Sequence, residues 1–161
     1  MDISVILCCY NSSERIRPTL EYLQASRLPK HLGCEVILVD NNCTDQTVSI
    51  AQQCWKREDF QLIVVSEKRP GVAYAREKGI QAASGKVYIF VDDDNWLSPS
   101  YLTEVYNKLL DSPGIAIAGG RGIAVCEGGE PPWFGDFSEG YAIGPDGISP
   151  TDVKSVVGAG M

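Results

Sequence analysis

Short apolar runs alternate with segments in which apolar residues recur at helical spacing. Residues 3–9 form an apolar run rich in Ile and Val, and Ile16, Leu20 and Leu23 follow at the spacing of one helix face. The same succession of strand, polar loop and helix recurs three more times along the chain. The expected strands are 35–39, 61–65 and 87–91, and the expected helices carry residues 48–55, 71–83 and 98–109. The pattern therefore predicts four consecutive βα units.

Two helix starts have side chains of the type that caps a helix. Thr44 is placed to cap the second helix, whose apolar positions are Val48, Ala51 and Trp55. Ser98 followed by Pro99 has the form of an N-cap with proline at the first helical position. We therefore expect these two helices to begin directly after Thr44 and Ser98.

Continuous apolar strands that are each followed by a helix predict an α/β fold. In such folds a mostly parallel sheet is covered by helices on both faces. Ligands bind at the carboxyl ends of the strands, where the strand order reverses. Polar clusters follow the expected strands at residues 10–12, 40–42 and 92–95. They converge on one crevice if the strand order is 3-2-1-4.

The pattern changes after Asp111. Residues 115–118 and 123–125 are expected as short strands, whereas residues 127–150 are rich in Gly, Pro and aromatic residues without a helical period. This second stretch fits either a ligand-facing loop or an ordered surface excursion. A further apolar run at 153–157 has nothing after it to complete another unit, so we expect a single domain that is cut short.

Composition narrows the possible partners. Hydrophobic residues make up 44% of the chain and charged residues 22%, which is ordinary for a folded globular domain. The net charge of -7 argues against nucleic acid, so any phosphate must be held locally by a helix N-terminus, an arginine or a cation. The start lacks a basic signal-peptide region, and no apolar run approaches the roughly 18 residues of a membrane span. We therefore expect a cytoplasmic protein, and the six cysteines show neither zinc-site nor disulfide-framework spacing.

Asp92, Asp93 and Asp94 follow the fourth expected strand directly. Three adjacent carboxylates repel one another, so at least one must be protonated or held by a cation unless water screens them. Oxygen ligands of this kind suit Mg²⁺ or Mn²⁺. Aspartates also favour the positive end of a following helix, but that alternative does not explain three of them in one strand-end loop.

Further candidates lie at the other strand ends. A carboxylate at Asp40 can accept hydrogen bonds from ribose hydroxyls or a base N–H. Gly71 can allow a close backbone approach, and Arg76, one turn into a helix, can point toward the crevice. The alternative for Arg76 is an exposed helix arginine paired with Glu77 or Glu67.

Taken together, these clusters resemble family 2 glycosyltransferases with the Rossmann-like GT-A fold. The resemblance rests on residues 5–11 (VILCCYN), 39–45 (VDNNCTD), 71–80 (GVAYAREKGI) and 90–94 (FVDDD), in this order and spacing. It covers residues 3 to about 110 and returns at 158–161. It implies that residues 1–112 are the units that bind a nucleotide sugar, and that residues 113–161 begin the acceptor side.

The resemblance also implies roles for individual residues. Residues 92–94 would be the D-x-D element, with Asp94 as direct metal ligand, Asp92 beside it, and Mg²⁺ or Mn²⁺ as cofactor. The implied nucleotide-binding residues are Cys8, Tyr10, Asn11, Asp40, Asn41, Arg76, Asp92 and Asp93. The implied reaction moves a sugar, with inversion, from a nucleotide-diphosphate sugar to a hydroxyl of a sugar or lipid-linked acceptor. Such reactions build polysaccharides or glycoconjugates, and some take place at the inner face of the membrane.

The sequence departs from the family pattern at several positions. Cys8-Cys9 stands where many relatives have a pair such as Pro-Thr, Asn41 where Asp is frequent, and Glu77 where Asn is usual. Inverting members of the family take their carboxylate general base from a motif downstream of the segment that matches residues 158–161. We therefore expect the base to be absent from this chain, which would then bind donor without full activity.

Two other functions fit parts of the pattern. A nucleotidyltransferase also places carboxylates and a metal on a parallel sheet, but usually has a Gly-rich, basic loop after its first strand, and residues 8–17 contain no glycine. A non-catalytic metal- or nucleotide-binding domain would need a lysine at a later strand end, which is not evident. Release of nucleoside diphosphate, of pyrophosphate, or of neither distinguishes the three functions.

Overall fold

The computed structural model describes residues 1–126 and 128–137. The elements are β1 (Ile3–Cys9), α1 (Ile16–Gln24), β2 (Cys34–Asp40), α2 (Thr47–Cys54), β3 (Phe60–Ser66), α3 (Val72–Ala82), β4 (Val87–Asp92), α4 (Tyr101–Asp111) and α5 (Phe134–Phe137). The four predicted βα units are confirmed.

The four strands form one parallel sheet in the order β3-β2-β1-β4, as predicted. In the register of the sheet Cys9 lies opposite Asp40, and Cys8 lies opposite Asp92. The last residues of β1, β2 and β4 therefore lie side by side at one edge. Because the strand order reverses at β1, this edge is where a parallel sheet of this kind binds ligands.

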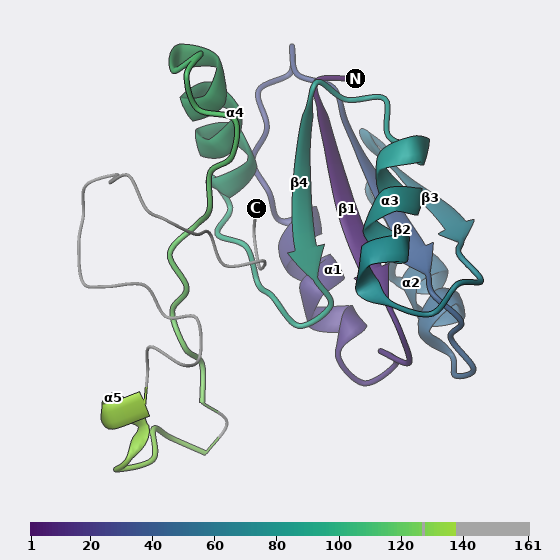
Figure 1. Cartoon of the computed structure of the whole chain (residues 1–161), viewed down its shortest axis with the longest axis vertical. Coiled ribbons are helices and arrows are strands. Elements are labelled where there is room, and N and C mark those ends of the chain that lie inside the picture. Colours follow the sequence, from purple (N-terminus) through teal and green to yellow (C-terminus); the bar gives the residue numbers. More distant parts are fainter. Residues whose placement is uncertain (127, 138–161) are drawn as a thin grey trace.

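Helices cover both faces of the sheet (Figure 1). On one face Val5 and Leu7 belong to a core that includes Leu20 of α1, Ala51 of α2 and Leu102 of α4. On the other face a smaller cluster joins residues of β1 and β2 to α3. The alternation of side chains along β1 thus divides the strand between two cores, which explains its continuous apolar run.

Helix α3 approaches the sheet closely at Gly79. A Cβ at this position would overlap Cγ2 of Ile6 and lie 3.3 Å from Cγ2 of Val39. Ala75, one turn earlier, is fully buried against the same strands. Small residues therefore let α3 lie flat on β1 and β2, and this position carries Arg76 toward the end of β4.

Both predicted helix starts are wrong by a few residues. Helix α2 begins at Thr47, where Oδ1 of Asp45 accepts the backbone N–H at 3.0 Å and the side-chain O–H at 2.6 Å. Helix α4 begins at Tyr101, whose N–H donates to the carbonyl of Ser98 at 3.0 Å. Thr44 does not cap α2, because its hydroxyl donates to Oδ1 of Asn11 instead. Ser98 does not cap α4, because residues 98–101 form a turn before the helix begins.

The strands expected at 115–118 and 123–125 are also wrong, because both segments are irregular. Ile117 and Ile123 are 65% and 81% exposed, so the apolar pattern is not used in a core here. A strand needs the backbone groups of a neighbour, and no strand of the described sheet pairs with these segments. The runs expected at 153–157 and 158–161 lie outside the described residues. Within residues 1–126 and 128–137, no helix has the length and apolar character needed to cross a bilayer.

Candidate functional site

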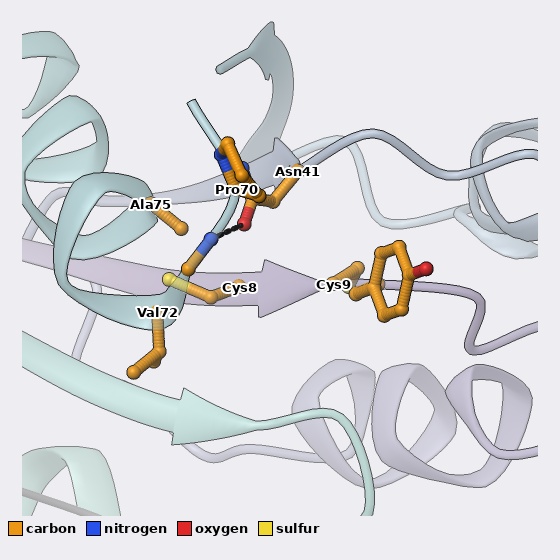
Figure 2. A pocket seen from close by; sticks show the side chains of 8 residues that line it. Cys8, Cys9, Asn41, Pro70, Val72 and Ala75 are labelled. Carbon is orange, nitrogen blue, oxygen red and sulfur yellow. Dashed lines mark hydrogen bonds between the residues drawn. The ribbon is translucent and has the colours of Figure 1, made fainter. Parts of the chain in front are cut away.

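A pocket of about 250 Å³ opens at the carboxyl edge of the sheet (Figure 2). It lies where the end of β1 meets the start of α3. Its lining residues are Cys8, Cys9, Tyr10, Asn41, Pro70, Gly71, Val72 and Ala75. Four of the residues singled out from sequence line it, Cys8, Tyr10, Asn41 and Gly71, whereas Asn11, Asp40, Arg76 and residues 92–94 do not.

The floor of the pocket is apolar. The sulfur of Cys8 points between Val72 and Ala75 (Figure 2). Burial raises the pKa of the Cys8 thiol to about 11, so the group is neutral at pH 7 and behaves as a small hydrophobe. Tyr10, at the mouth, is 63% exposed and presents a ring to solvent. Such a floor and mouth suit a flat ring with a polar edge.

Asp40 and Asn41 end β2 in different ways. Oδ1 of Asp40 accepts the N–H of Cys43 at 2.8 Å, which fixes the orientation of a half-buried carboxylate. Asn41 is buried, and its side-chain amide bonds to backbone groups of residues 67–71. Of these two adjacent residues, Asp40 therefore presents a carboxylate at the end of β2, whereas the amide of Asn41 is bonded within the protein.

Asn11 joins the loops after β1 and β2. Its Oδ1 accepts the backbone N–H of Thr44 at 2.8 Å and the Thr44 hydroxyl at 3.3 Å. Its backbone is left-handed, with φ of 49°, a conformation that asparagine tolerates better than most residues. This predicted nucleotide contact therefore has its carbonyl oxygen engaged within the protein.

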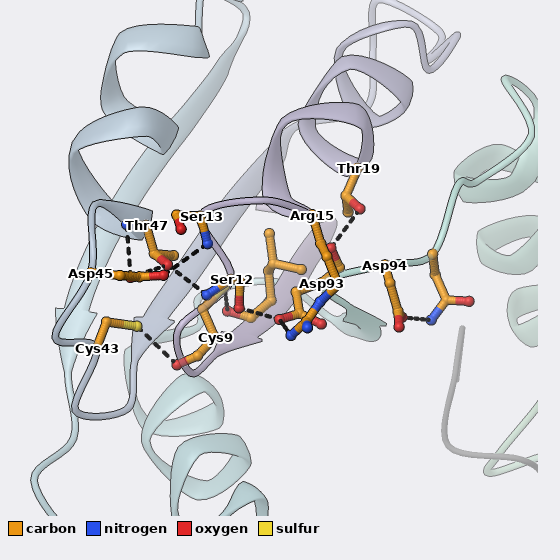
Figure 3. A network of polar contacts seen from close by, with 12 residues as sticks. Cys9, Ser12, Ser13, Arg15, Thr19, Cys43, Asp45, Thr47, Asp93 and Asp94 are labelled. Carbon is orange, nitrogen blue, oxygen red and sulfur yellow. Dashed lines mark hydrogen bonds and ion pairs between the residues drawn. The ribbon is translucent and has the colours of Figure 1, made fainter. Parts of the chain in front are cut away.

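The middle carboxylate of the acidic triplet is bound within the protein (Figure 3). Oδ2 of Asp93 accepts the Ser12 hydroxyl and lies 3.0 Å from Nη2 of Arg15, and its backbone carbonyl accepts the Thr19 hydroxyl at 2.9 Å. The Asp93 side chain is only 15% exposed. Asp93 therefore fastens the loop after β4 to α1.

Asp92 faces the pocket side of the sheet and pairs with Arg76. Oδ1 of Asp92 lies 3.6 Å from Nη2 of Arg76, whose guanidinium is 5.4 Å from the ring centre of Phe90. Burial raises the pKa of the Asp92 carboxyl, Arg76 opposes this rise, and the neighbouring carboxylate of Asp94 adds to it. The expected placement of Arg76 toward the crevice agrees with this geometry.

Glu67 and Glu77, the alternative partners considered for Arg76, form ion pairs with Arg69. Nη2 of Arg69 lies 2.8 Å from Oε2 of Glu67 and 3.0 Å from Oε2 of Glu77. Hydrogen bonds from the Arg69 side chain and backbone N–H lower the pKa of the Glu67 carboxyl to about 2. Sequence reasoning missed Arg69, although a cation directly before Pro70-Gly71 at a strand-end loop was a usable signal.

Because Asp93 is bonded to Ser12 and Arg15, Asp92 and Asp94 are the two residues of the acidic triplet that remain as candidate metal ligands. Asp94 is exposed, and its Oδ1 receives a long contact of 3.4 Å from Nδ2 of Asn95. Across residues 1–126 and 128–137, His, Cys, Asp and Glu side chains form no group of three that could hold a metal alone. Two hard oxygen ligands fit Mg²⁺ or Mn²⁺ when substrate phosphates supply the remaining ligands. The charge repulsion expected from sequence is partly relieved by Arg15 and Arg76, so by itself it is weaker evidence for a metal.

Comparison with known proteins identifies the family. The pattern described as Glycosyl transferase family 2 matches residues 4–147. Glycosyltransferase AglE of Haloferax volcanii is 31% identical over 124 residues, which are 74% of this chain and 38% of that protein. Poly(ribitol-phosphate) beta-glucosyltransferase of Bacillus spizizenii is 32% identical over 110 residues, 66% of this chain and 17% of that protein. The chain thus spans well under half of the length of these relatives.

Solved structures agree with the sequence relatives. The crystal structure of S. aureus TarS in complex with UDP matches with a TM-score of 0.63 and 28% identity, over 79% of this chain and 38% of that one. The mannosyltransferase PcManGT from Pyrobaculum calidifontis, in complex with GDP-Man and Mn²⁺, matches with a TM-score of 0.61 and 27% identity, over 66% and 32%. By sequence and by fold, the chain belongs to glycosyl transferase family 2.

Proposed function

We propose that the pocket binds the nucleotide part of a nucleotide-diphosphate sugar, and that the protein transfers the sugar to an acceptor hydroxyl. The observation that carries this proposal is the arrangement of residues at the carboxyl ends of the strands. There an apolar pocket opens beside the ends of β1 and β2, Asp40 is the last residue of β2, and Asp92, the last residue of β4, pairs with Arg76. The relatives support it, because TarS and PcManGT are described with UDP and GDP-Man.

The base and ribose have partners in the pocket and at the neighbouring end of β2. The base fits against the apolar floor at Cys8, and the exposed ring of Tyr10 can stack on it. The carboxylate oxygens of Asp40 can accept a hydrogen bond from a base N–H or a ribose hydroxyl. The hydrogen bond from Cys43 fixes the orientation of this carboxylate before the ligand binds. Asn11 and Asn41 shape the surrounding loops through their own hydrogen bonds.

The diphosphate needs positive charge that the acidic chain provides locally. Arg76 pairs with Asp92 of the acidic triplet, and Asp92 and Asp94 would hold a Mg²⁺ or Mn²⁺ ion there. When bound, such an ion stabilises the charge that develops on the leaving diphosphate. In the metal-free site Arg76 neutralises the Asp92 carboxylate. When the ion compensates that carboxylate instead, Arg76 can contact a phosphate oxygen.

Transfer by this route replaces the bond from the anomeric carbon to the diphosphate with a bond to the acceptor oxygen. Attack from the face opposite the diphosphate inverts the anomeric centre, and a general base takes the acceptor proton. A sugar or lipid-linked acceptor in polysaccharide or glycoconjugate synthesis agrees with relatives such as the poly(ribitol-phosphate) glucosyltransferase.

Product analysis tests this proposal. The protein is incubated with UDP-sugars and GDP-sugars, Mn²⁺ and a panel of acceptor sugars, and the released nucleotide is identified by chromatography. We expect nucleoside diphosphate from donors of one base, at a slow rate if the general base is absent. Release of pyrophosphate would instead identify a nucleotidyltransferase. Binding without release of either product would identify a non-catalytic nucleotide-binding domain.

A further inference from the structure

We infer that Asn41 is a positioning residue that holds the loop between β3 and α3 in the shape of a pocket wall and does not donate a hydrogen bond to the nucleotide. The loop comprises residues 67–71, and Pro70 and Gly71 line the pocket together with Val72 of α3. The inference rests on the proposed function, because the wall belongs to the proposed nucleotide pocket.

The side-chain amide of Asn41 makes three hydrogen bonds to the loop, and these use both of its N–H donors. Its Nδ2 donates to the carbonyl of Glu67 at 3.0 Å and to the carbonyl of Arg69 at 2.7 Å. Its Oδ1 accepts the N–H of Gly71 at 2.9 Å, the bond drawn in Figure 2. Asn41 is only 6% exposed. A side-chain amide has two N–H donors, and both are used here, so neither remains to donate to a ligand.

These partners fix both the orientation and the identity of the side chain. Two carbonyls require donors, and a backbone N–H requires an acceptor, so one orientation of an amide satisfies all three. An ionised aspartate would place oxygen against both carbonyls of the loop, losing two bonds and adding repulsion. An alanine would leave the same backbone groups without these partners.

Asn41 connects this loop to the edge of the sheet. Its own N–H donates to the carbonyl of Cys9 at 2.9 Å, and the N–H of Glu67 donates to the carbonyl of Asp40 at 2.9 Å. The loop is thereby held against the ends of β1 and β2. Gly71 has φ of 125°, a conformation that other residues rarely adopt, so the loop reaches the pocket in a shape that needs external support.

A binding experiment with Asn41→Asp and Asn41→Ala tests the inference. The affinities for UDP and GDP are measured by calorimetry with Mn²⁺ at about pH 7.5 and about pH 5.5, each relative to the unaltered protein at that pH. At the higher pH we expect both variants to bind the preferred nucleotide about tenfold more weakly or worse. The control Asn107→Asp adds the same charge on the exposed surface of α4 and should bind within about twofold of the unaltered protein.

The lower pH separates positioning from general damage. The residues adjoining position 41 include Asp40 on β2 and Glu67 and Arg69 on the loop. Burial and the two carboxylates raise the pKa of the carboxyl that Asn41→Asp introduces, and Arg69 lowers it. Once protonated, that carboxyl regains an O–H donor. The relative affinity of Asn41→Asp should therefore recover at least severalfold at about pH 5.5, whereas that of Asn41→Ala should not. A deficit of Asn41→Asp that is the same at both pH values, or full affinity of either variant at about pH 7.5, would overturn the inference.

Hydrogen exchange on the unaltered, nucleotide-free protein provides a second test that needs no variant. We expect the Gly71 amide to exchange at least about tenfold more slowly than an unstructured amide, because Asn41 accepts its hydrogen. Exchange at the unstructured rate would overturn the inference. If the unaltered protein binds no nucleotide, the proposed function fails, and the exchange rate still shows whether the loop is held.

Discussion

At the scale of single residues, three adjacent aspartates occupy three different environments. Asp93 is bonded to Ser12 and Arg15 and is largely shielded from solvent. Asp92 is half-buried beside Arg76, and Asp94 is exposed. One of these identical side chains therefore fastens a loop, while the other two remain available to the proposed donor site. The difference comes from partners that lie far away in the sequence.

The ion pair of Glu67 and Arg69 makes stability depend on pH. The pKa of the Glu67 carboxyl is lowered to about 2 from an ordinary value of 4.5. Its stabilising effect is therefore complete above about pH 4.5 and is lost as the pH falls toward about pH 2. We predict that Glu67→Gln unfolds at a lower urea concentration than the unaltered protein at about pH 7, and that this difference narrows at about pH 3.

Glu77→Gln is the matched control for that measurement. Glu77 also pairs with Arg69, at 3.0 Å, but its side chain is 52% exposed, against 9% for Glu67. Exposed ion pairs contribute little to stability. An equal loss of stability in both variants, or a Glu67→Gln deficit independent of pH, would contradict this account of the loop.

At the scale of elements, the contact of α3 with the sheet depends on Gly79. Helix propensity alone predicts that Gly79→Ala stabilises the protein by about 1 kcal/mol. A Cβ there would overlap Ile6, however, so overpacking should dominate and the free energy of unfolding should fall by about 1–3 kcal/mol. Chemical denaturation measures the sign directly.

Gly114→Ala serves as the control, because a Cβ at Gly114 meets nothing within 4 Å. Its effect should stay within about 0.5 kcal/mol. An increase of stability in Gly79→Ala would show that α3 lies further from β1 than the overlap with Ile6 implies. Arg76, which α3 carries, would then also lie further from Asp92.

The sequence predicted the strands well, because a strand covered on both faces must be a continuous apolar run. Helix starts were harder. Oδ2 of Asp45 accepts the N–H of Ser13 at 3.0 Å while Oδ1 bonds to Thr47, so the start of α2 depends on a loop more than thirty residues away. The pattern at 115–118 was misleading for a similar reason, because a local pattern does not reveal whether a neighbouring strand is present.

The same distinction applies to the site. The positions of Asp40, Asp92 and Asp94 followed from the topology, because parallel strands end at one edge. The hydrogen bonds of Asn41 and Asp93 did not, because a sequence shows which groups can bond but not which partners they find.

At the scale of the whole molecule, an acidic chain presents local positive charge at the proposed donor site. The net charge of -7 disfavours an anionic ligand at long range, and screening limits that effect to about 10 Å in ordinary salt. Close to the pocket Arg76 pairs with Asp92, a carboxylate that a divalent ion held by Asp92 and Asp94 would compensate. We therefore predict that donor binding depends on a metal ion held by Asp94.

Thermal unfolding with UDP, GDP, TDP and CDP, each with and without Mn²⁺, tests this claim most directly. A ligand that binds only the folded protein raises the unfolding temperature, in proportion to RT ln(1 + [L]/Kd). We predict a Mn²⁺-dependent rise with one nucleotide that disappears in Asp94→Ala, whose unfolding temperature without ligand should equal that of the unaltered protein because Asp94 is exposed. In Asp93→Ala the ligand-free unfolding temperature itself should fall, because that carboxylate holds Ser12 and Arg15. A rise that persists in Asp94→Ala, or no rise with any nucleotide, would contradict the account.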